Sequence, residues 1–256
     1  MQTQRPQILI SNDDGIHAPG IRILAEVAHE FGDVTIVAPD SPQSAMGHAI
    51  SIAKPLRLTK DTLSNGMIGY ACNGTPADCV KLATGVLMKT TPDLVISGIN
   101  HGTNTSTSTI YSGTLSAARE GALQDIPAVG FSLCHYDHEA DMEACRAIAR
   151  IILAKALGLP LSKGQVWNVN IPFLPLAEIK GIKWTHQAKG RWVEEFDERK
   201  DPYNKTYYWL TGKFYLLDES SECDEIAVKE GYVSVTPLMH DLTNYKILKK
   251  MEGIEF

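Results

Sequence analysis

Short, mainly apolar runs alternate with stretches of helical periodicity through the first two thirds of the chain. Residues 8–11 and 34–38 have the length and composition of buried strands. Between them, apolar side chains recur at helical spacing at Ile21, Leu24, Ala25, Ala28 and Phe31. The pattern predicts a strand, a helix and a second strand in succession.

The same alternation continues further along the chain. It predicts strands at residues 94–99, 128–133 and 166–171, and helices over 117–123 and 144–157. Another helix is expected from Thr75, a capping residue, through Pro76 in the first turn to about Met88. Strands that alternate with helices indicate an α/β fold with a three-layer, mostly parallel sheet.

The pattern changes after about residue 181. Aromatic and alternating segments at 207–210 and 231–237 predict β-hairpins, and the acidic run at 218–224 is interpreted as a solvated loop. One hairpin is expected to contact a partner subunit, because an isolated two-stranded ribbon is marginally stable in water. We therefore divide the chain into a metal- and phosphate-binding core, 1–181, and an oligomerising hairpin extension, 182–256.

Two adjacent carboxylates follow the first predicted strand. Parallel sheets bind ligands at the carboxyl ends of their strands, which is where Asp13 and Asp14 lie. Two interpretations stay open at this point. The pair either forms a turn in which one Asp caps the next helix, or it holds a hard cation such as Mg²⁺ or Mn²⁺, with Gly15 letting the backbone turn away.

Two further polar loops follow predicted strands. Residues 38–49 contain Ser44, which taken alone is typical of a turn. Residues 97–114 are almost devoid of apolar side chains, and so long a loop is usually functional or disordered. Its end, Ser112-Gly113-Thr114, predicts a helix N-terminus, either as a plain cap or as a phosphate cradle.

Composition narrows the function classes. The 256 residues carry a formal net charge of −6 and no run of Lys or Arg, which argues against duplex nucleic acid as a partner. No stretch approaches the roughly 18 apolar residues of a membrane span, and no apolar signal region precedes the first strand. Five cysteines without a CxxC pair are typical of reduced thiols. We expect a cytoplasmic protein without a membrane partner.

The HxxH run at 135–138 lacks a partner cluster and is interpreted as a surface loop, not a zinc site.

Several sequence motifs, taken together, indicate a family that the chain resembles. In order, they are ILISNDDG, APDSPQSAMGHA, NGTPADCV, LVISGINHGTNT, YSGTLSAAREG, NKTYYWLTG and GYVSVTPL. This series resembles the SurE family of stationary-phase survival proteins, which are metal-dependent 5′-nucleotidases. The resemblance implies a Rossmann-like core with a swapped C-terminal extension, a homodimer or homotetramer, and phosphate release from nucleoside 5′-monophosphates, with 3′-monophosphates and short polyphosphate as further substrates.

The resemblance also implies a set of site residues. One divalent cation per subunit, Mg²⁺ or Mn²⁺, is expected at Asp13, Asp14, Ser44 and Asn100, of which the two aspartates and Asn100 are the expected catalytic residues. The phosphate site is expected at Asn104, Ser112, Gly113 and Thr114. Asp14 is expected as a ligand, a base or a nucleophile. Ala45 stands where a glycine commonly follows the loop serine, so a left-handed backbone there would weaken the assignment of Ser44.

Three alternatives are weighed against this hypothesis. A haloacid-dehalogenase-like phosphatase also places an Asp after the first strand, but it needs D-x-D, and here Asp13 and Asp14 are adjacent. A non-catalytic nucleotide-binding or sensing module would bind ligand without turnover. A dinucleotide oxidoreductase is disfavoured because no G-x-G-x-x-G follows the first strand.

Overall fold

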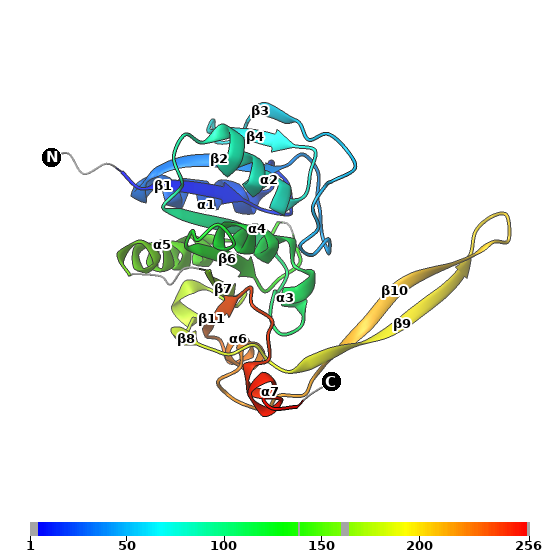
Figure 1. Cartoon of the computed structure of the whole chain (residues 1–256). Coiled ribbons are helices and arrows are strands. Elements are labelled where there is room, and N and C mark those ends of the chain that lie inside the picture. Colours follow the sequence, from blue (N-terminus) through cyan, green and yellow to red (C-terminus); the bar gives the residue numbers. More distant parts are fainter. Residues whose placement is uncertain (1–4, 138, 160–163, 255–256) are drawn as a thin grey trace.

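A large twisted sheet forms the centre of the molecule. The structure is a computed structural model that describes residues 5–137, 139–159 and 164–254. Within these residues nine strands are hydrogen-bonded in the order β3-β4-β2-β1-β5-β6-β7-β11-β8 (Figure 1). In chain order they are β1 (Gln7–Ser11), β2 (Asp33–Pro39), β3 (Leu58–Thr62), β4 (Ile68–Cys72), β5 (Leu94–His101), β6 (Ala128–Leu133), β7 (Gln165–Ile171), β8 (Ile182–Trp184) and β11 (Val233–Met239).

Most neighbouring strands are parallel. β1 pairs in parallel with β2 on one side and with β5 on the other, and β5, β6 and β7 continue in parallel. The antiparallel pairs in this sheet lie nearer its edges, where β3 meets β4 and where β11 meets β7. The chain reverses its direction of travel across the sheet at β1, which places a topological switch point between β1 and β5.

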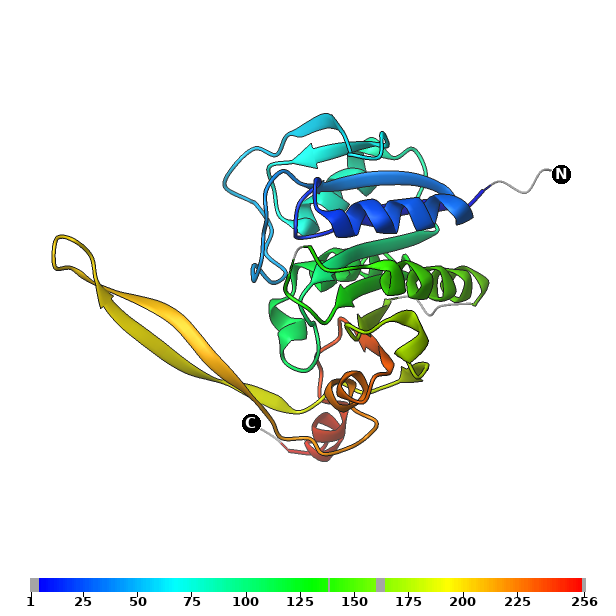
Figure 2. The same cartoon turned by 180° about the vertical axis from the view of Figure 1, so that it is seen from behind.

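Helices cover both faces of this sheet. Helices α1 (Pro19–Phe31) and α5 (Glu143–Gly158) contact each other and face the viewer in Figure 2, with their apolar sides in one buried cluster. Helices α2 (Pro76–Leu82) and α4 (Gly113–Ala122) contact each other and enclose a second cluster on the opposite face. The strands between them are almost completely buried, so the expected three-layer α/β fold is confirmed.

The remaining elements lie at the ends of the sheet. A long antiparallel hairpin of β9 (Gly190–Lys200) and β10 (Thr206–Leu216) projects away from the body (Figures 1 and 2). The short helices are α3 (Ser108–Tyr111), α6 (Asp224–Lys229), α7 (Tyr245–Lys250), η1 (Ala83–Leu87) and η2 (Leu176–Glu178). The predicted boundary after residue 181 stays a prediction. β8 and β11 belong to the large sheet, whereas the β9–β10 hairpin stands apart from it.

Three local predictions are wrong. Residues 231–237 do not form a hairpin, because β11 instead extends the central sheet between β7 and β8. Helix α2 ends at Leu82, and the chain continues to Leu87 as a π-helical turn instead of as one α-helix to Met88. The acidic run is not wholly solvated, because the side chain of Asp224 is completely buried.

Two other expectations, on the cysteines and on the start of α2, are confirmed. All five cysteines are free. Thr75 caps α2 and forms a reciprocal capping box with Asp78. None of the helices in the described ranges is long and apolar enough to cross a bilayer.

Candidate active site

The switch point of the sheet brings together side chains that are far apart in sequence. Asp13 and Asp14 follow β1, and Asn100 lies near the end of the neighbouring β5. Gly15 has a φ of +98°, which allows the sharp turn from β1 toward α1 at little conformational cost. The Asn12 side chain holds this turn, because its amide donates to the Gly15 carbonyl at 2.8 Å and its oxygen accepts from the Gly15 N–H at 3.2 Å.

A cavity of about 760 Å³ opens at this point. Six of the eight predicted site residues line it: Asp13, Asp14, Ser44, Asn100, Asn104 and Ser112. Gly113 and Thr114 are absent from its wall and lie behind Asp13 instead. The Thr114 hydroxyl donates to Asp13 Oδ1 at 2.5 Å, and a Cβ built on Gly113 would stand 2.6 Å from Asp13 Cβ.

Asp13 is an unusually buried carboxylate. Its residue surface is only 5% exposed, and its pKa is raised to about 6. Burial is the main cause; the hydrogen bonds from Thr114 oppose the shift, and the neighbouring charge of Asp14 adds to it. No Lys or Arg among the described residues forms an ion pair with either carboxylate. Within the described residues, the charge of the pair is therefore not offset by a Lys or Arg side chain.

His101 approaches the second carboxylate. Its backbone N–H donates to Asp14 Oδ2 at 3.3 Å, and its ring Nδ1 lies 3.5 Å from the same oxygen. The ring is buried beside Asp14 and lines the cavity. Sequence reasoning did not assign His101 a role, although its position directly after Asn100 in the polar loop was the signal that could have done so.

The donor set fits a hard divalent cation. The part of the chain that the structure describes contains no group of three or more His, Cys, Asp or Glu side chains arranged to hold a metal. The predicted set is instead two carboxylates, the Ser44 hydroxyl and the Asn100 amide, all of which offer the oxygen atoms that Mg²⁺ and Mn²⁺ prefer. The Asn100 amide nitrogen donates to the Gly102 carbonyl at 2.8 Å, which leaves the amide oxygen as its ligand atom. A cation there would offset the repulsion between Asp13 and Asp14.

The loop that carries Ser44 has a strained residue beside it. Ala45 has a φ of +60°, the left-handed conformation that glycine adopts most easily. The loop nevertheless places Ser44 in the cavity wall, and backbone hydrogen bonds hold the loop in place before and after Ser44. Gln43 N–H donates to the Asp13 carbonyl at 2.8 Å and Gly47 N–H donates to the Tyr111 carbonyl at 3.0 Å.

An ion-pair cluster anchors the same loop further along. His48 Nε2 lies 3.0 Å from Glu120 Oε2, and Lys81 Nζ lies 2.9 Å from Glu120 Oε1. The Glu120 side chain is buried in α4, and these partners lower its pKa against the effect of burial. The cluster connects the Ser44 loop to both α2 and α4.

Asn104 belongs to a buried polar network. Its N–H donates to Asn170 Oδ1 at 2.9 Å and its side-chain amide donates to Ser132 Oγ at 2.8 Å, while the Asn168 amide donates to its carbonyl at 2.8 Å. These partners come from β6 and β7, where they interrupt otherwise apolar strands. Sequence reasoning missed them, and polar residues within buried runs were the available signal.

The C-terminal part of the chain braces the same loop. The buried Asp224 carboxylate accepts hydrogen bonds from the N–H groups of Ser106 at 2.9 Å and Ala188 at 3.0 Å. Burial raises the pKa of Asp224. Thr105 donates to Glu225, so α6 and the start of the hairpin are both fastened to the loop after β5.

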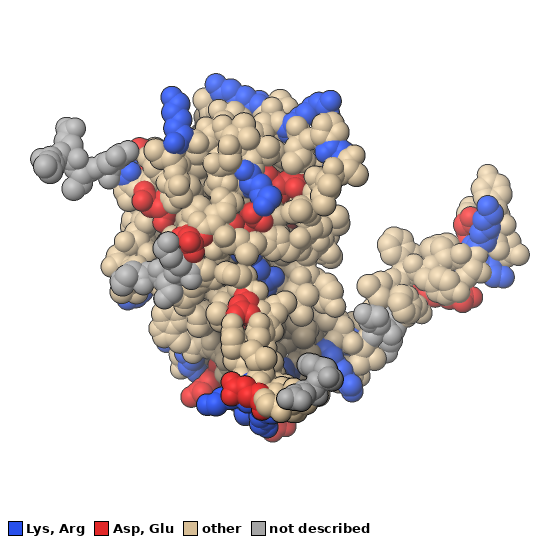
Figure 3. Space-filling view, viewed as in Figure 1, with Lys and Arg blue, Asp and Glu red and all other residues tan. Residues whose placement is uncertain are grey.

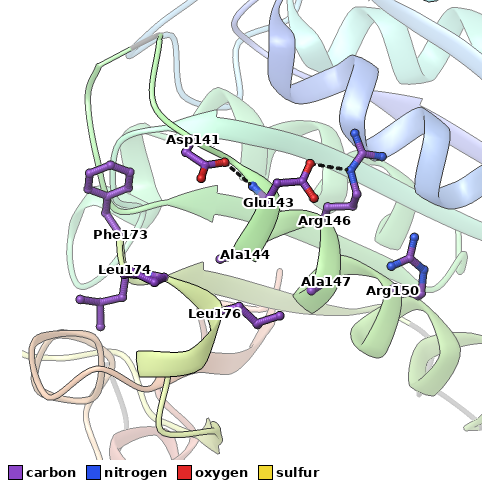
Figure 4. A pocket seen from close by; sticks show the side chains of 10 residues that line it. Asp141, Glu143, Ala144, Arg146, Ala147, Arg150, Phe173, Leu174 and Leu176 are labelled. Atoms are coloured by element: carbon purple, nitrogen blue, oxygen red, sulfur yellow. Dashed lines mark hydrogen bonds and ion pairs between the residues drawn. The ribbon is translucent and has the colours of Figure 1, made fainter.

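A second cavity lies elsewhere. It has a volume of about 400 Å³ between α5 and residues 173–176 (Figure 4), and none of the predicted site residues lines it. Its charged groups have partners of their own, since Arg146 pairs with Glu143 and Glu26, and the Asp141 carboxylate accepts from the Glu143 N–H. The HxxH segment forms no ligand set in the described residues; His135 stacks on Phe173, and His138 lies outside them.

Comparisons with known proteins agree with this geometry. Residues 8–194 match the family model described as "Survival protein SurE". The chain is 52% identical to a protein of Christiangramia forsetii named "5′-nucleotidase SurE", over 99% of this chain and 98% of that one. It is 51% identical to a protein of the same name from Cytophaga hutchinsonii, over 96% of each chain. The crystal structure of the SurE protein from Aquifex aeolicus superposes with a TM-score of 0.82 at 40% identity, covering 96% of this chain and 98% of that one.

Proposed function

The chain belongs to the SurE family, and from that premise we propose that it is a 5′-nucleotidase that releases phosphate from nucleoside 5′-monophosphates with the help of one divalent cation per subunit, Mg²⁺ or Mn²⁺. The relatives that carry this name align over nearly the whole chain. The observation that carries the proposal is the pair of Asp13 and Asp14, without a Lys or Arg partner in the described residues, in the wall of a cavity that is also lined by neutral hydrogen-bonding groups.

Phosphate monoester hydrolysis depends mainly on charge neutralisation and on a positioned water. A divalent cation held by Asp13, Asp14, Ser44 and Asn100 would supply Lewis acidity to the phosphate and to the water. Two carboxylates around such a cation leave a local charge near zero. An acidic protein can therefore accept a dianionic substrate at this site.

The chain's own residues orient the ester. Ser112 caps α4 by accepting the Leu115 N–H at 3.0 Å, which leaves its hydroxyl hydrogen to donate to a phosphate oxygen. The positive end of the α4 dipole lies at the same place. Thr114 donates to Asp13 and so sets the direction of that carboxylate, while Asn104 stabilises the cavity wall through its contacts with β6 and β7.

Asp14 and His101 form the proton-handling side of the cavity. The two side chains are in contact, and both line the cavity wall. We propose that Asp14 binds the cation and helps to orient the attacking water, with His101 fixing the direction of its carboxylate. Trapping of a phosphorylated Asp14 after an acid quench would contradict this non-covalent route.

Phosphate release from a panel of substrates tests the proposal. We expect protein treated with a chelator to be inactive on AMP, and addition of Mg²⁺ or Mn²⁺ to restore activity. Asp13→Ala and Asp14→Ala are expected to lower kcat/KM by about a hundredfold or more, as for loss of a main electrostatic group. The control is Asp40→Ala, an exposed carboxylate on the neighbouring loop that does not line the cavity.

The same panel separates the alternatives. A binding or sensing module would retain AMP affinity and release no phosphate with any metal, which would contradict the proposed activity. Release from 3′-monophosphates and short polyphosphate is expected beside release from AMP, as the resemblance implies. Assembly into a homodimer or homotetramer remains part of the proposal, and the particle mass in solution tests it.

A further inference from the structure

Two chemically different sets of side chains line the cavity. One set consists of the carboxylates, Ser112 and the polar loop after β5. The other consists of three aromatic side chains, namely Tyr111 at the end of α3, Tyr136 in the loop after β6, and Trp192 on β9. They are 55%, 69% and 42% exposed, respectively. Nothing in the phosphate chemistry described above uses these rings.

Two of the rings pack closely against neighbouring residues. The Tyr136 ring lies against Gly102, where a Cβ would stand 2.6 Å from the ring Cε1. Trp192 packs edge-on against Phe214, its cross-strand partner, with ring centroids 5.6 Å apart at 61°. Trp192 also lies over Gly212, where a Cβ would be 3.4 Å from the indole Cε3. Glycine at these positions makes room for the rings and holds no competing side chain.

The size and charge of the cavity match a ligand with a flat, uncharged part. A volume of about 760 Å³ is far larger than a phosphate group and a cation need. In the space-filling view, most of the coloured surface where the hairpin leaves the body is uncharged (Figure 3). Exposed aromatic faces beside a polar site favour a planar ring that can stack on them.

We propose that these aromatic side chains form the nucleobase subsite and that Trp192 is its main stacking side chain. The inference rests on the proposed nucleotidase activity and adds to it the part of the substrate that the hairpin contacts. Trp192 offers the largest ring of the three and is the least exposed of them. It stands on the hairpin, whereas Tyr111 and Tyr136 belong to the body of the molecule. The base of a bound nucleotide is then held between the body of the molecule and the β9–β10 hairpin.

A comparison of two substrates tests this subsite. AMP and ribose 5-phosphate present the same phosphate ester on a ribose, and only AMP carries a base. We expect Trp192→Ala to lower kcat/KM for AMP about tenfold or more, mainly through a higher KM, because base stacking on an aromatic side chain is worth roughly that factor. Activity on ribose 5-phosphate should change less than about twofold, a difference too small to reflect a lost stacking contact. Trp192→Phe should restore most of the AMP activity.

Trp209→Ala is the matched control. Trp209 stands on the same hairpin, is exposed and does not line the cavity, so its replacement should leave both substrates unaffected. A parallel fall for AMP and ribose 5-phosphate in Trp192→Ala would show a structural role and overturn the subsite. Unchanged activity on AMP would overturn it as well. Failure of the wild-type protein to release phosphate from either substrate would instead contradict the nucleotidase activity.

A binding measurement tests the subsite without turnover. Titration of the chelator-treated protein with adenosine, which carries the base and no phosphate charge, should quench tryptophan fluorescence, whereas ribose should not. The quenching should disappear in Trp192→Phe and persist in Trp209→Phe. Equal quenching in these two variants would contradict stacking on Trp192.

Discussion

Two features of Asp13 make a charged carboxylate unfavourable at this position in the folded protein. Its carboxylate is buried, and it stands beside a second carboxylate without a Lys or Arg partner in the described residues. Both features disfavour the charged form, which is why its pKa rises to about 6. Such a residue costs stability at neutral pH, and this cost is understandable if the site is built to receive a cation.

The pH dependence of stability without metal tests this cost. The unfolded chain binds the Asp13 proton only below about pH 4, and the folded chain binds it below about pH 6. The free energy of unfolding therefore falls as the pH rises between these values. Asp13→Asn stays neutral and keeps an oxygen acceptor for Thr114. We expect it to match the wild-type protein near pH 4 and to exceed it by on the order of 2–3 kcal/mol above pH 6.

Urea unfolding in the presence of a chelator measures this difference. Asp40→Asn, which removes an exposed carboxylate on the adjacent loop, should follow the wild-type curve at every pH. An Asp13→Asn curve that also stays parallel to wild type would show that Asp13 is not destabilised by burial.

Ala45 is the second residue whose conformation carries a cost. A left-handed backbone costs an ordinary residue about 1–2 kcal/mol, and glycine avoids this cost while losing more entropy on folding. We expect Ala45→Gly to raise the free energy of unfolding by up to about 1 kcal/mol. Ala53→Gly, in the same long loop but without a positive φ, should lower it by about 0.5–1 kcal/mol. Two changes of the same sign would contradict the assignment of strain to Ala45.

At the scale of elements, α4 positions Asp13 from behind. The first turn of this helix packs so closely on the carboxylate that only glycine fits at position 113. The prediction that Gly113 contributes to the phosphate site stays a prediction, and the structure adds this close contact with Asp13. The helix N-terminus and the loop after β1 thus form one unit.

Replacement of Gly113 tests that contact. A Cβ there would stand 2.6 Å from Asp13 Cβ and 2.9 Å from its Oδ2, so Gly113→Ala must displace the carboxylate. We expect kcat/KM for AMP to fall at least about tenfold, because misplacement of a site group by 1 Å has large effects on rate. Gly158→Ala, at the end of α5 with nothing within 4 Å of its Cβ, should have no effect on activity. Equal activities in the two variants would contradict the packing described here.

The sequence predicted those elements in which apolar and polar side chains follow a clear pattern along the chain. The buried parallel strands read as apolar runs, and β6 begins and ends where its run does. β3 was missed because its residues, LTKDT, are mostly polar and exposed at the edge of the sheet. β11 was placed in a hairpin because its alternation does not distinguish a ribbon from an antiparallel strand added to the central sheet.

At the scale of the whole molecule, the site results from strand order. Asp13 and Asn100 are 87 residues apart in sequence, and they meet because β1 and β5 are neighbours at the switch point. The general rule for parallel sheets predicted where Asp13 and Asp14 lie, and the family resemblance added Asn100. The contacts of Asp224 with Ser106 and Ala188 could not be predicted, because no local pattern says which distant backbone amides a buried carboxylate will bind.

The β9–β10 hairpin contributes Trp192 and Leu210–Gly212 to the wall of the cavity. Asp224 binds the N–H groups of Ala188, just before the hairpin, and of Ser106 in the loop after β5. The hairpin residues beyond the cavity carry exposed aromatic side chains, including Phe196, Tyr208 and Trp209. The expected contact with a partner subunit through this hairpin remains part of the proposal.

Calorimetric titration of chelator-treated protein with Mn²⁺ at pH 7 tests the central claim most directly. Our account predicts one Mn²⁺ bound per chain, loss of this binding in both Asp13→Asn and Asp14→Asn, and retention of it in Asp40→Asn. Binding of Mn²⁺ by the Asp13 and Asp14 variants as tightly as by the wild-type protein, or no binding by the wild-type protein, would contradict it.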